Sequence, residues 1–347
     1  MQETLKRALE ELALAPELIE RVLDSGYFLR TWANPFSGTT WTTVSDMMYG
    51  NKQFSSSFPI EEFVQYVKGE FTFPELPPFV ILHVKSIDDI KASLADPRRA
   101  HYIEDGAFSY RGQPRSYTFQ RRIPNPVRAG AEGREISVTA GIYRQTSEVY
   151  SFRTPPIERR SFRHFLRHLE PNNPAAWAAS HYAYDTMRTE QHYATQTAGL
   201  DLTFEIETAI FFATHKMKWD QYDRAYYEKV ERGEHNGVIY CFRFTNPTVR
   251  QTQYLIREFD LFKTYPPERI LRQTCALPLF LQEERNIAIT DLNCIIQLDP
   301  NFEYEARLTP EYMFPNTQED RFYGKLLQLK DKYPEDLKNV VEYRWAR

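Results

Sequence analysis

The segment "SYRGQ", residues 109–113, combines residue types that could bind an anion. Arg111 ends a short apolar run and Gly112 permits a sharp departure of the chain, so Arg111 is expected at the end of a strand. Its planar guanidinium suits bidentate contact with phosphate or carboxylate, and Gln113, on the same side of an extended chain, could add a hydrogen bond. A solvated surface charge or a structural ion pair is the commoner role of such an arginine, and both alternatives stay open.

The segment "EQHYATQTAGLDLTFEIETAIFFATHK", residues 190–216, could also hold an anion. Leu200 is expected to begin a short strand in which Asp201 and Thr203 share one face, and residues 205–213 are expected to form an apolar helix. Side-chain oxygens at a helix start can cap its amides, and the same amides attract anions. Both a capping role and a binding role are therefore predicted for this junction.

Further polar residues could face the same pocket as Arg111. We expect His192 at the C-terminal end of a helix, where both a structural role and a site role stay open, and we place Thr197 in the same pocket. Gln273 enters an apolar segment within residues 266–280. Because a buried glutamine needs partners, it either satisfies backbone groups in the core or orients a ligand.

Composition limits the classes of function. The 347 residues include 43 Lys and Arg against 47 Asp and Glu, and the net charge of −4 disfavours nucleic acid as a partner. No apolar run approaches the roughly 18 residues of a membrane span, and three cysteines in apolar surroundings fit reduced thiols, so we expect a cytoplasmic protein without membrane contact. The clustered histidines follow helix faces without an accompanying cysteine or carboxylate set, so no metal site is predicted.

Strand and helix patterns alternate irregularly along the chain. This favours an α+β fold with a mixed, mainly antiparallel sheet and flanking helices over a doubly wound α/β fold. We expect a helical and loop extension over residues 1–85, a central domain over 86–300 that opens with a helix capped by Ser86, and a tail over 301–347 whose two helices join at Pro334 and pack on the core. The expected strands are residues 79–84, 107–113, 134–143, 237–244 and 292–299, and the expected helices include residues 2–23, 58–71, 157–170 and 174–193.

Taken together and in this order, these segments resemble the FRG domain family, which is named for an N-terminal Phe/Tyr-Arg-Gly motif. "YRGQ" at residues 110–113 matches that motif, and residues 190–213 follow the family pattern A-Q-H-Y-G-L-P-T-R-L-L-D-W-T and its apolar helix. "RILRQTCALPLF" matches the family segment R-I-x-x-Q-x-G-x-F through Arg269 and Gln273. The match covers roughly residues 86–300.

The chain also departs from the family pattern. Residues 194–198 replace the family's G-L-P-T-R, so the arginine of that turn is missing. Leu202 replaces a tryptophan, and Cys275 with Ala276 replaces a Gln-Gly pair, whereas Glu158 matches an acidic position upstream of the central helix. A ligand contact made by the missing arginine in the family is therefore not expected in this chain.

The layout of the family is similar to that of ADP-ribosyltransferases, and this resemblance implies NAD as the substrate. It implies that Arg111 binds the NAD phosphates, that Asp201 and Thr203 hold the nicotinamide riboside, and that Gln273 faces an oxocarbenium-like transition state. The residues expected to act in catalysis are Arg111, Thr203 and Gln273, and those expected to bind NAD are Arg111, Gln113, His192, Thr197 and Asp201.

Two functions follow from the resemblance. The first is an NAD-consuming enzyme, either an ADP-ribosyltransferase with a protein acceptor or an NAD glycohydrolase, such as an intracellular toxin or anti-phage effector. Because glutamine carries no charge, Gln273 would stabilise the transition state less than a glutamate would. The alternative is therefore a nucleotide-binding or protein-interaction module that does not turn its ligand over.

Overall fold

The computed structural model describes most of the chain. The described residues are 2–50, 57–74, 79–104, 107–130, 132–155, 189–243, 266–276, 285–288, 292–305 and 307–346. The helix expected at residues 157–170, with Glu158, and most of the helix expected at 174–193 lie outside them. Residues 189–193 are helical, so His192 does lie at a helix end.

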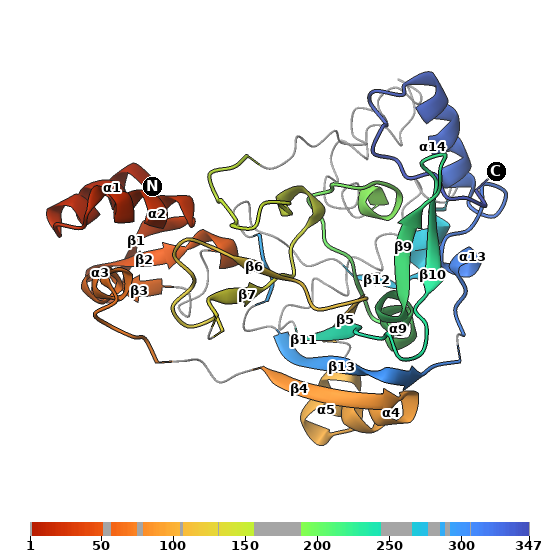
Figure 1. Cartoon of the computed structure of the whole chain (residues 1–347), viewed down its shortest axis with the longest axis horizontal. Coiled ribbons are helices and arrows are strands. Elements are labelled where there is room, and N and C mark those ends of the chain that lie inside the picture. Colours follow the sequence, from red (N-terminus) through yellow and green to blue (C-terminus); the bar gives the residue numbers. More distant parts are fainter. Residues whose placement is uncertain are drawn as a thin grey trace.

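A six-stranded sheet forms the centre of the molecule, and the expected α+β class with a mainly antiparallel sheet is confirmed (Figure 1). The strands in spatial order are β12 (Cys275–Ala276), β8 (Leu202–Thr203), β5 (Phe108–Gln113), β11 (Val238–Arg243), β13 (Leu292–Glu303) and β4 (Val80–Ser86). Only the β13–β4 pair of this sheet is parallel. The sheet thus includes β4, which precedes the expected boundary at residue 86.

Helix α9 (Ile206–Thr214) lies unusually close to β5 and β11. A Cβ atom added to Gly112 would lie 1.8 Å from the carbonyl oxygen of Ala209, and one added to Gly237 would lie 2.2 Å from that of Ala213. Gly112 is inside β5, where its φ is not left-handed, so the expected sharp departure of the chain at this residue is wrong. The glycine is required because the helix backbone occupies the space of a side chain.

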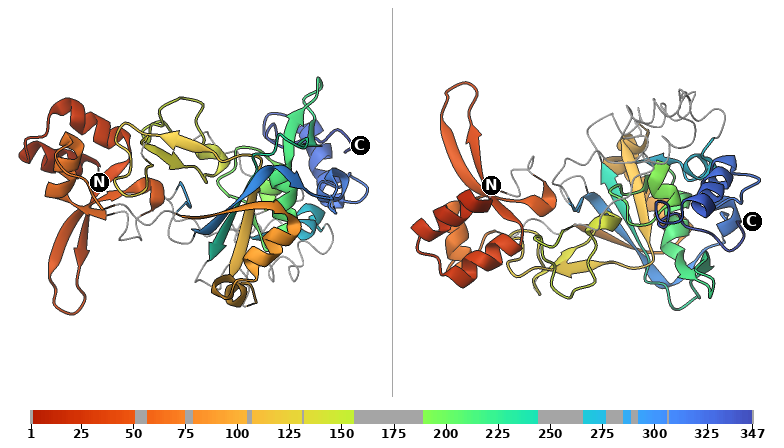
Figure 2. Two further views of the ribbon diagram at one scale, coloured as in Figure 1. Left: turned by 60° about the horizontal axis from the view of Figure 1, so that its bottom comes forward. Right: turned by 90° about the horizontal axis from the view of Figure 1, so that it is seen from above.

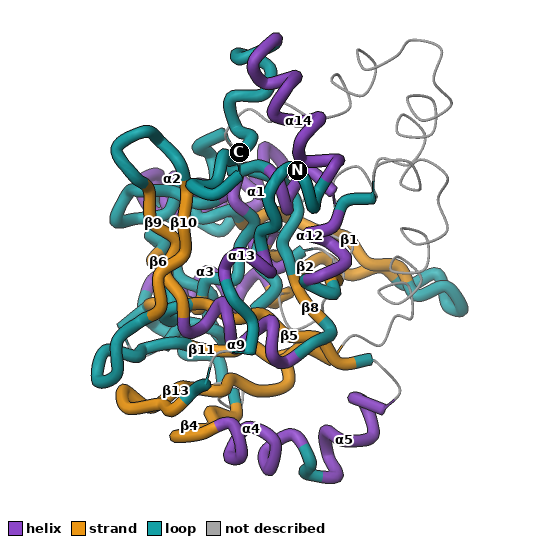
Figure 3. Tube along the Cα trace, turned by 90° about the vertical axis from the view of Figure 1, so that its right-hand side faces the viewer, coloured by secondary structure: helices purple, strands orange, loops and turns teal. Residues whose placement is uncertain are grey.

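The edge of the sheet at β4 continues into two helices, α4 (Ile87–Leu94) and α5 (Pro97–Glu104), which Figure 3 shows beyond that edge. Ser86 caps α4 as expected, because its hydroxyl accepts from the amide of Asp89 while the Asp89 carboxylate accepts from the amide of Ser86. On the other side of α9, strands β9 (His215–Trp219) and β10 (Ala225–Lys229) pair as a hairpin.

The N-terminal residues form their own apolar core, with the β1–β2 hairpin projecting from it (Figure 2). Its elements are α1 (Gln2–Glu11), α2 (Pro16–Asp24), β1 (Tyr27–Ala33), β2 (Thr40–Asp46), η1 (Met47–Tyr49), β3 (Ser57–Pro59) and α3 (Ile60–Lys68). The helical pattern of residues 2–23 is interrupted and restarts at Pro16, because proline fits the first turn of a helix but not its interior.

A buried ion network joins this N-terminal part to a small sheet of β6 (Thr118–Gln120) and β7 (Arg134–Ile136). The Arg121 guanidinium lies 2.7 Å from the Asp46 carboxylate and 2.9 Å from the Glu135 carboxylate, and all three side chains are fully buried. Both carboxylates share the one guanidinium, and the Asn125 amide and the Tyr49 hydroxyl donate further hydrogen bonds to them, so the network links sequence-distant segments with every buried charge hydrogen-bonded.

The tail packs on the central domain, but one expected helix is wrong. Its helices are α13 (Pro310–Met313) and α14 (Arg321–Lys332), whereas residues 334–339 form turns. The chain after Pro334 is not helical because the main chains of Val340 and Tyr343 form β-bridges with Ala194 and Ala225. No described helix is long and apolar enough to cross a membrane.

Replacing Gly112 with alanine is expected to destabilise the fold, because the new Cβ would collide with the Ala209 carbonyl. Overpacking of this kind costs roughly 1–3 kcal/mol, and more where backbone must move. Chemical denaturation followed by circular dichroism measures the change in the free energy of unfolding. Gly130→Ala is the matched control, because the nearest atom to its added Cβ is 3.7 Å away and its φ is not left-handed. Equal losses in the two variants would contradict the close helix contact.

Candidate functional site

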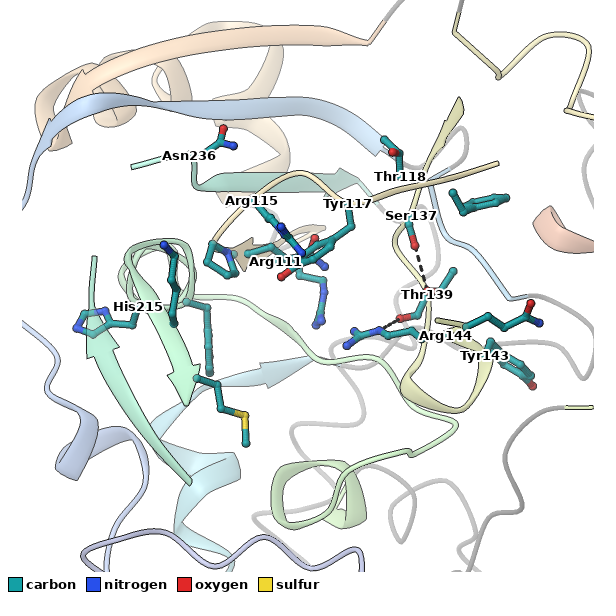
Figure 4. Close-up of a pocket in the computed structure, with 18 of the residues that line it drawn as sticks. Arg111, Arg115, Tyr117, Thr118, Ser137, Thr139, Tyr143, Arg144, His215 and Asn236 are labelled. Atoms are coloured by element: carbon teal, nitrogen blue, oxygen red, sulfur yellow. Dashed lines mark hydrogen bonds between the residues drawn. The ribbon is translucent and has the colours of Figure 1, made fainter. Parts of the chain in front are cut away.

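Two cavities meet at Arg111. The outer cavity has a volume of about 1040 Å³ and is drawn in Figure 4, and the inner pocket has a volume of about 140 Å³. Arg111, Gly112, Phe212 and Tyr227 line both. Small-ligand sites have volumes of about 300–1,000 Å³, so the outer cavity could hold a ligand as large as a dinucleotide, with one end in the inner pocket.

Positive side chains dominate the lining of the outer cavity. Its cationic residues are Arg111, Arg115, Arg134, Arg144, Lys216 and Lys218. The acidic residues of its lining are Glu148 and Glu234. A concave surface with this surplus attracts anions, although the whole chain carries a net negative charge.

Arg111 and Arg144 approach the same part of this cavity from different segments (Figure 4). Burial, reinforced by the charge of Arg144, lowers the pKa of Arg111 to about 10, an effect that the carboxylate of Asp201 partly offsets. Burial also lowers the pKa of Arg144. Two desolvated cations that disfavour each other's charge would be stabilised by a bound anion.

The hydrogen bonds of Arg111 leave donors for a ligand. Nη1 donates to the carbonyl oxygen of Asp201 at 2.6 Å, whereas the buried Nε has no partner among the described residues. Gln113, two residues along β5, is buried and lines the outer cavity, and its Oε1 likewise has no partner in the described part of the chain. The structure thus brings Arg111 and Gln113 to one cavity, as the alternation of a strand predicts.

In the inner pocket, His192 and Gln273 contact each other directly. His192 Nδ1 lies 3.1 Å from Gln273 Oε1, and Gln273 Nε2 donates to the carbonyl oxygen of Met313 at 2.9 Å. Both the oxygen and the nitrogen of the Gln273 side-chain amide therefore have protein partners, and the oxygen holds the imidazole of His192 in place. This corresponds to the structural alternative for a buried glutamine more than to a ligand-facing role.

Asp201 and Thr203 share the inner pocket but differ in how accessible they are. The Thr203 hydroxyl donates to the Gln273 carbonyl at 2.8 Å and accepts from the Glu205 amide at 3.0 Å, so it fixes the start of α9. The Asp201 side chain is 37% exposed and is the only acidic group in the described lining of this pocket. Asp201 is accordingly the carboxylate that a ligand in the inner pocket would meet.

Thr197 lies apart from both cavities. Its hydroxyl is buried and contacts the carbonyl oxygen of Gly199 at 3.5 Å, and its own carbonyl accepts from the Ile142 amide in η3 (Gly141–Tyr143). It lines neither cavity. The chain bends at Gln196, whose φ is +57°, and the backbone of Thr197 is hydrogen-bonded to η3.

Sequence reasoning did not place Arg144 or Tyr227 in the site, and it left Arg269 without a defined role. Arg144 comes directly after the strand expected at residues 134–143, but only residues 134–136 form a strand and no motif marked this arginine. Tyr227 belongs to a hairpin that the sequence did not suggest. Arg269 is fully buried, and its Nη1 donates to the carbonyl oxygen of His192 at 3.1 Å. The centres of three tyrosine rings lie 3.8–4.6 Å from its guanidinium carbon, and they belong to Tyr193, Tyr323 and Tyr343.

Residues of the C-terminal tail hold the side chains next to His192 in place. Asp320 accepts from the hydroxyl of Tyr193 at 2.6 Å, and burial raises the pKa of this carboxyl above its usual value. Tyr323 donates to the carbonyl of Val341 at 2.9 Å and so ties α14 to the last residues of the chain. Cation–π contacts and these hydrogen bonds connect the tail to His192 through Arg269.

Comparisons with models of protein families, with curated proteins and with solved structures find no match for this chain. The FRG assignment therefore stays a resemblance that three sequence segments carry. What the site can bind must be argued from its geometry and charge.

Replacing Arg111 with methionine is expected to leave the free energy of unfolding unchanged within about 1 kcal/mol or to raise it. The pKa of Arg111 is lower in the folded chain than in an unfolded one, so its positive charge disfavours folding at neutral pH. Urea denaturation measures the effect. Arg121→Met is the matched comparison, because it leaves the buried Asp46 and Glu135 carboxylates without their cation. This loss should lower the free energy of unfolding by about 3–5 kcal/mol. Similar large losses in both variants would refute the distinction.

Proposed function

We propose that the outer cavity binds the phosphates of a nucleotide and that NAD is the ligand. The observation that carries the proposal is the pair Arg111 and Arg144, two desolvated guanidiniums that line the outer cavity, with Arg111 also lining the inner pocket. Guanidinium groups suit bidentate contact with phosphate, and two of them match the two phosphates of a dinucleotide. Gln113 adds an amide at the same wall.

The inner pocket suits the nicotinamide riboside end of NAD. Phe212 and Tyr227 provide aromatic walls between the two cavities, and Asp201 provides a negative charge. Breaking the bond between nicotinamide and ribose gives an oxocarbenium-like state, which a nearby carboxylate stabilises. Nicotinamide leaves as a neutral base with the bonding electron pair, and water or a protein nucleophile then adds to the ribose carbon and releases its proton.

In this proposal Asp201 takes the role that the resemblance gave to Gln273. The amide of Gln273 is held between His192 and Met313, so its oxygen is not directed at a ligand. Thr203 likewise uses its hydroxyl to position the backbone. His192, Thr203 and Gln273 are therefore positioning residues for Asp201 and Arg111.

A second candidate function is nucleotide binding without turnover. The observation that favours it is that the Gln273 amide is bonded to His192 and Met313. Asp201 is then the one acceptor of the pair that could stabilise the transition state. Such a module would keep the cationic cavity and lack nicotinamide release. The two functions share the ligand and differ only in the chemical step.

Isothermal titration calorimetry with NAD tests the binding step. Arg111→Met and Arg144→Met should each weaken binding about 10- to 100-fold, as expected for a hydrogen bond to a charged group worth about 1.5–3 kcal/mol. Arg98→Met removes the same charge from an exposed residue paired with Asp96 and should leave NAD affinity unchanged. Wild-type protein that does not bind NAD, or binding that Arg111→Met leaves intact, would contradict the proposal.

Nicotinamide release, measured with and without a mixture of protein acceptors, separates the two candidate functions. Asp201→Asn should keep NAD affinity and slow release about 100-fold or more, because an amide replaces the charge that stabilises the transition state. NAD binding without any release by the wild-type chain would favour the non-catalytic module. Release that is unchanged in Asp201→Asn would remove Asp201 from the proposed mechanism.

A further inference from the structure

We propose that His192, Asp201 and Cys275 form a binding site for one divalent ion of the zinc type. The three side chains come from the helical residues 189–193, the residue just before β8 and the edge strand β12. Their ligand atoms all lie within 4.8 Å of one another. This inference does not rest on the proposed NAD chemistry, because it concerns only which ion these three side chains bind.

The hydrogen bonds of Gln273 determine which nitrogen of His192 can bind an ion. Gln273 Nε2 donates to the Met313 carbonyl, so the amide oxygen Oε1 must face His192 Nδ1. An oxygen acceptor at 3.1 Å requires the proton of a neutral imidazole to be on Nδ1. The lone pair is then on Nε2, which is how second-shell acceptors orient histidines that bind metals.

Nε2 of His192 lies 3.7 Å from Oδ1 of Asp201. For a neutral imidazole, two electron-rich atoms would face each other across this gap, and a cation between them would turn repulsion into attraction. Zinc bonds to nitrogen and oxygen of about 2.0–2.2 Å in a tetrahedral site place the two ligand atoms about 3.4 Å apart. The observed separation is therefore close to the one that a shared zinc ion requires.

Cys275 completes a set of donors that favours zinc over magnesium or calcium. The residue is 1% exposed, and the amide Nε2 of Gln191 lies 3.9 Å from its sulfur and donates to it, which holds the sulfur in place. Pairing of β12 with β8, with Cys275 opposite Thr203, fixes the thiol two residues from Asp201 in the strand register. One thiolate and one carboxylate balance the charge of a divalent ion, and thiolate with imidazole selects zinc-type ions.

The fourth position of such an ion would open into the inner pocket, which His192 and Asp201 both line. Three protein ligands and one open position are typical of zinc sites that bind water or a substrate group. An ion at this site would bind the carboxylate of Asp201. Metal binding and the proposed NAD cleavage would then compete for the same side chain.

Cobalt(II) titration of the full chain, after treatment with a chelator, tests the site, because a cobalt–thiolate bond gives a charge-transfer absorption band. The wild-type chain should bind one equivalent with this band, and zinc should displace the cobalt. Cys275→Ser should remove the band, and Asp201→Asn should weaken binding by at least about 10-fold, the lower limit for losing even an outer-shell partner. Cys294→Ala, which removes a buried thiol of β13, is the control and should leave the band intact.

Zinc X-ray absorption of the wild-type chain provides a readout that needs no variant, and it should show one sulfur ligand with nitrogen or oxygen ligands. Absence of stoichiometric cobalt and zinc binding would overturn the proposal, as would a thiolate band that survives in Cys275→Ser. Circular dichroism verifies that each variant is folded. None of these readouts depends on NAD, so a failure of the proposed enzyme and a failure of the metal site can be distinguished.

Discussion

The close contact between α9 and the central sheet is the constraint on which the candidate site depends. Gly112 and Gly237 leave room for backbone carbonyls of the helix at distances that no side chain would permit. With α9 this close, the chain just before it forms β8 beside β5, where Tyr110 pairs with Thr203. The carbonyl of Asp201 then meets the guanidinium of Arg111. A single packing contact thus determines where the arginine, the aspartate and the threonine lie relative to one another.

Among the arginines that reach the interior of the described structure, Arg121, Arg269 and Arg111 are stabilised differently. Arg121 is paired with two carboxylates, and Arg269 is surrounded by tyrosine rings and donates to one carbonyl. Arg111 has a carbonyl on one nitrogen and a second arginine as its neighbour. Of these three arginines, Arg111 has the least favourable surroundings for its charge, and it is the one that lines both cavities. A buried charge that its neighbours compensate only in part is more typical of binding sites than of structural networks.

The tail is a structural part of the site. Its tyrosines surround Arg269, which bonds the backbone of His192, and its Met313 carbonyl holds the amide of Gln273. These contacts orient the imidazole whichever ligand the inner pocket takes, whether a nicotinamide riboside or a metal ion. Residues separated by more than a hundred positions therefore act together on one side chain.

The sequence by itself determined the class of the fold, most strands of the central sheet and several helix ends, because apolar periodicity and side-chain caps act over a few residues. The strand at 107–113, the cap at Ser86 and the junction at Asp201 and Thr203 were predictable for this reason. Only the tertiary structure decided that Thr197 turns away from the pocket, that Gln273 is held by His192 and Met313, and that Arg144 stands beside Arg111. Each of these depends on contacts between segments far apart in the chain, and local patterns do not encode which distant groups meet.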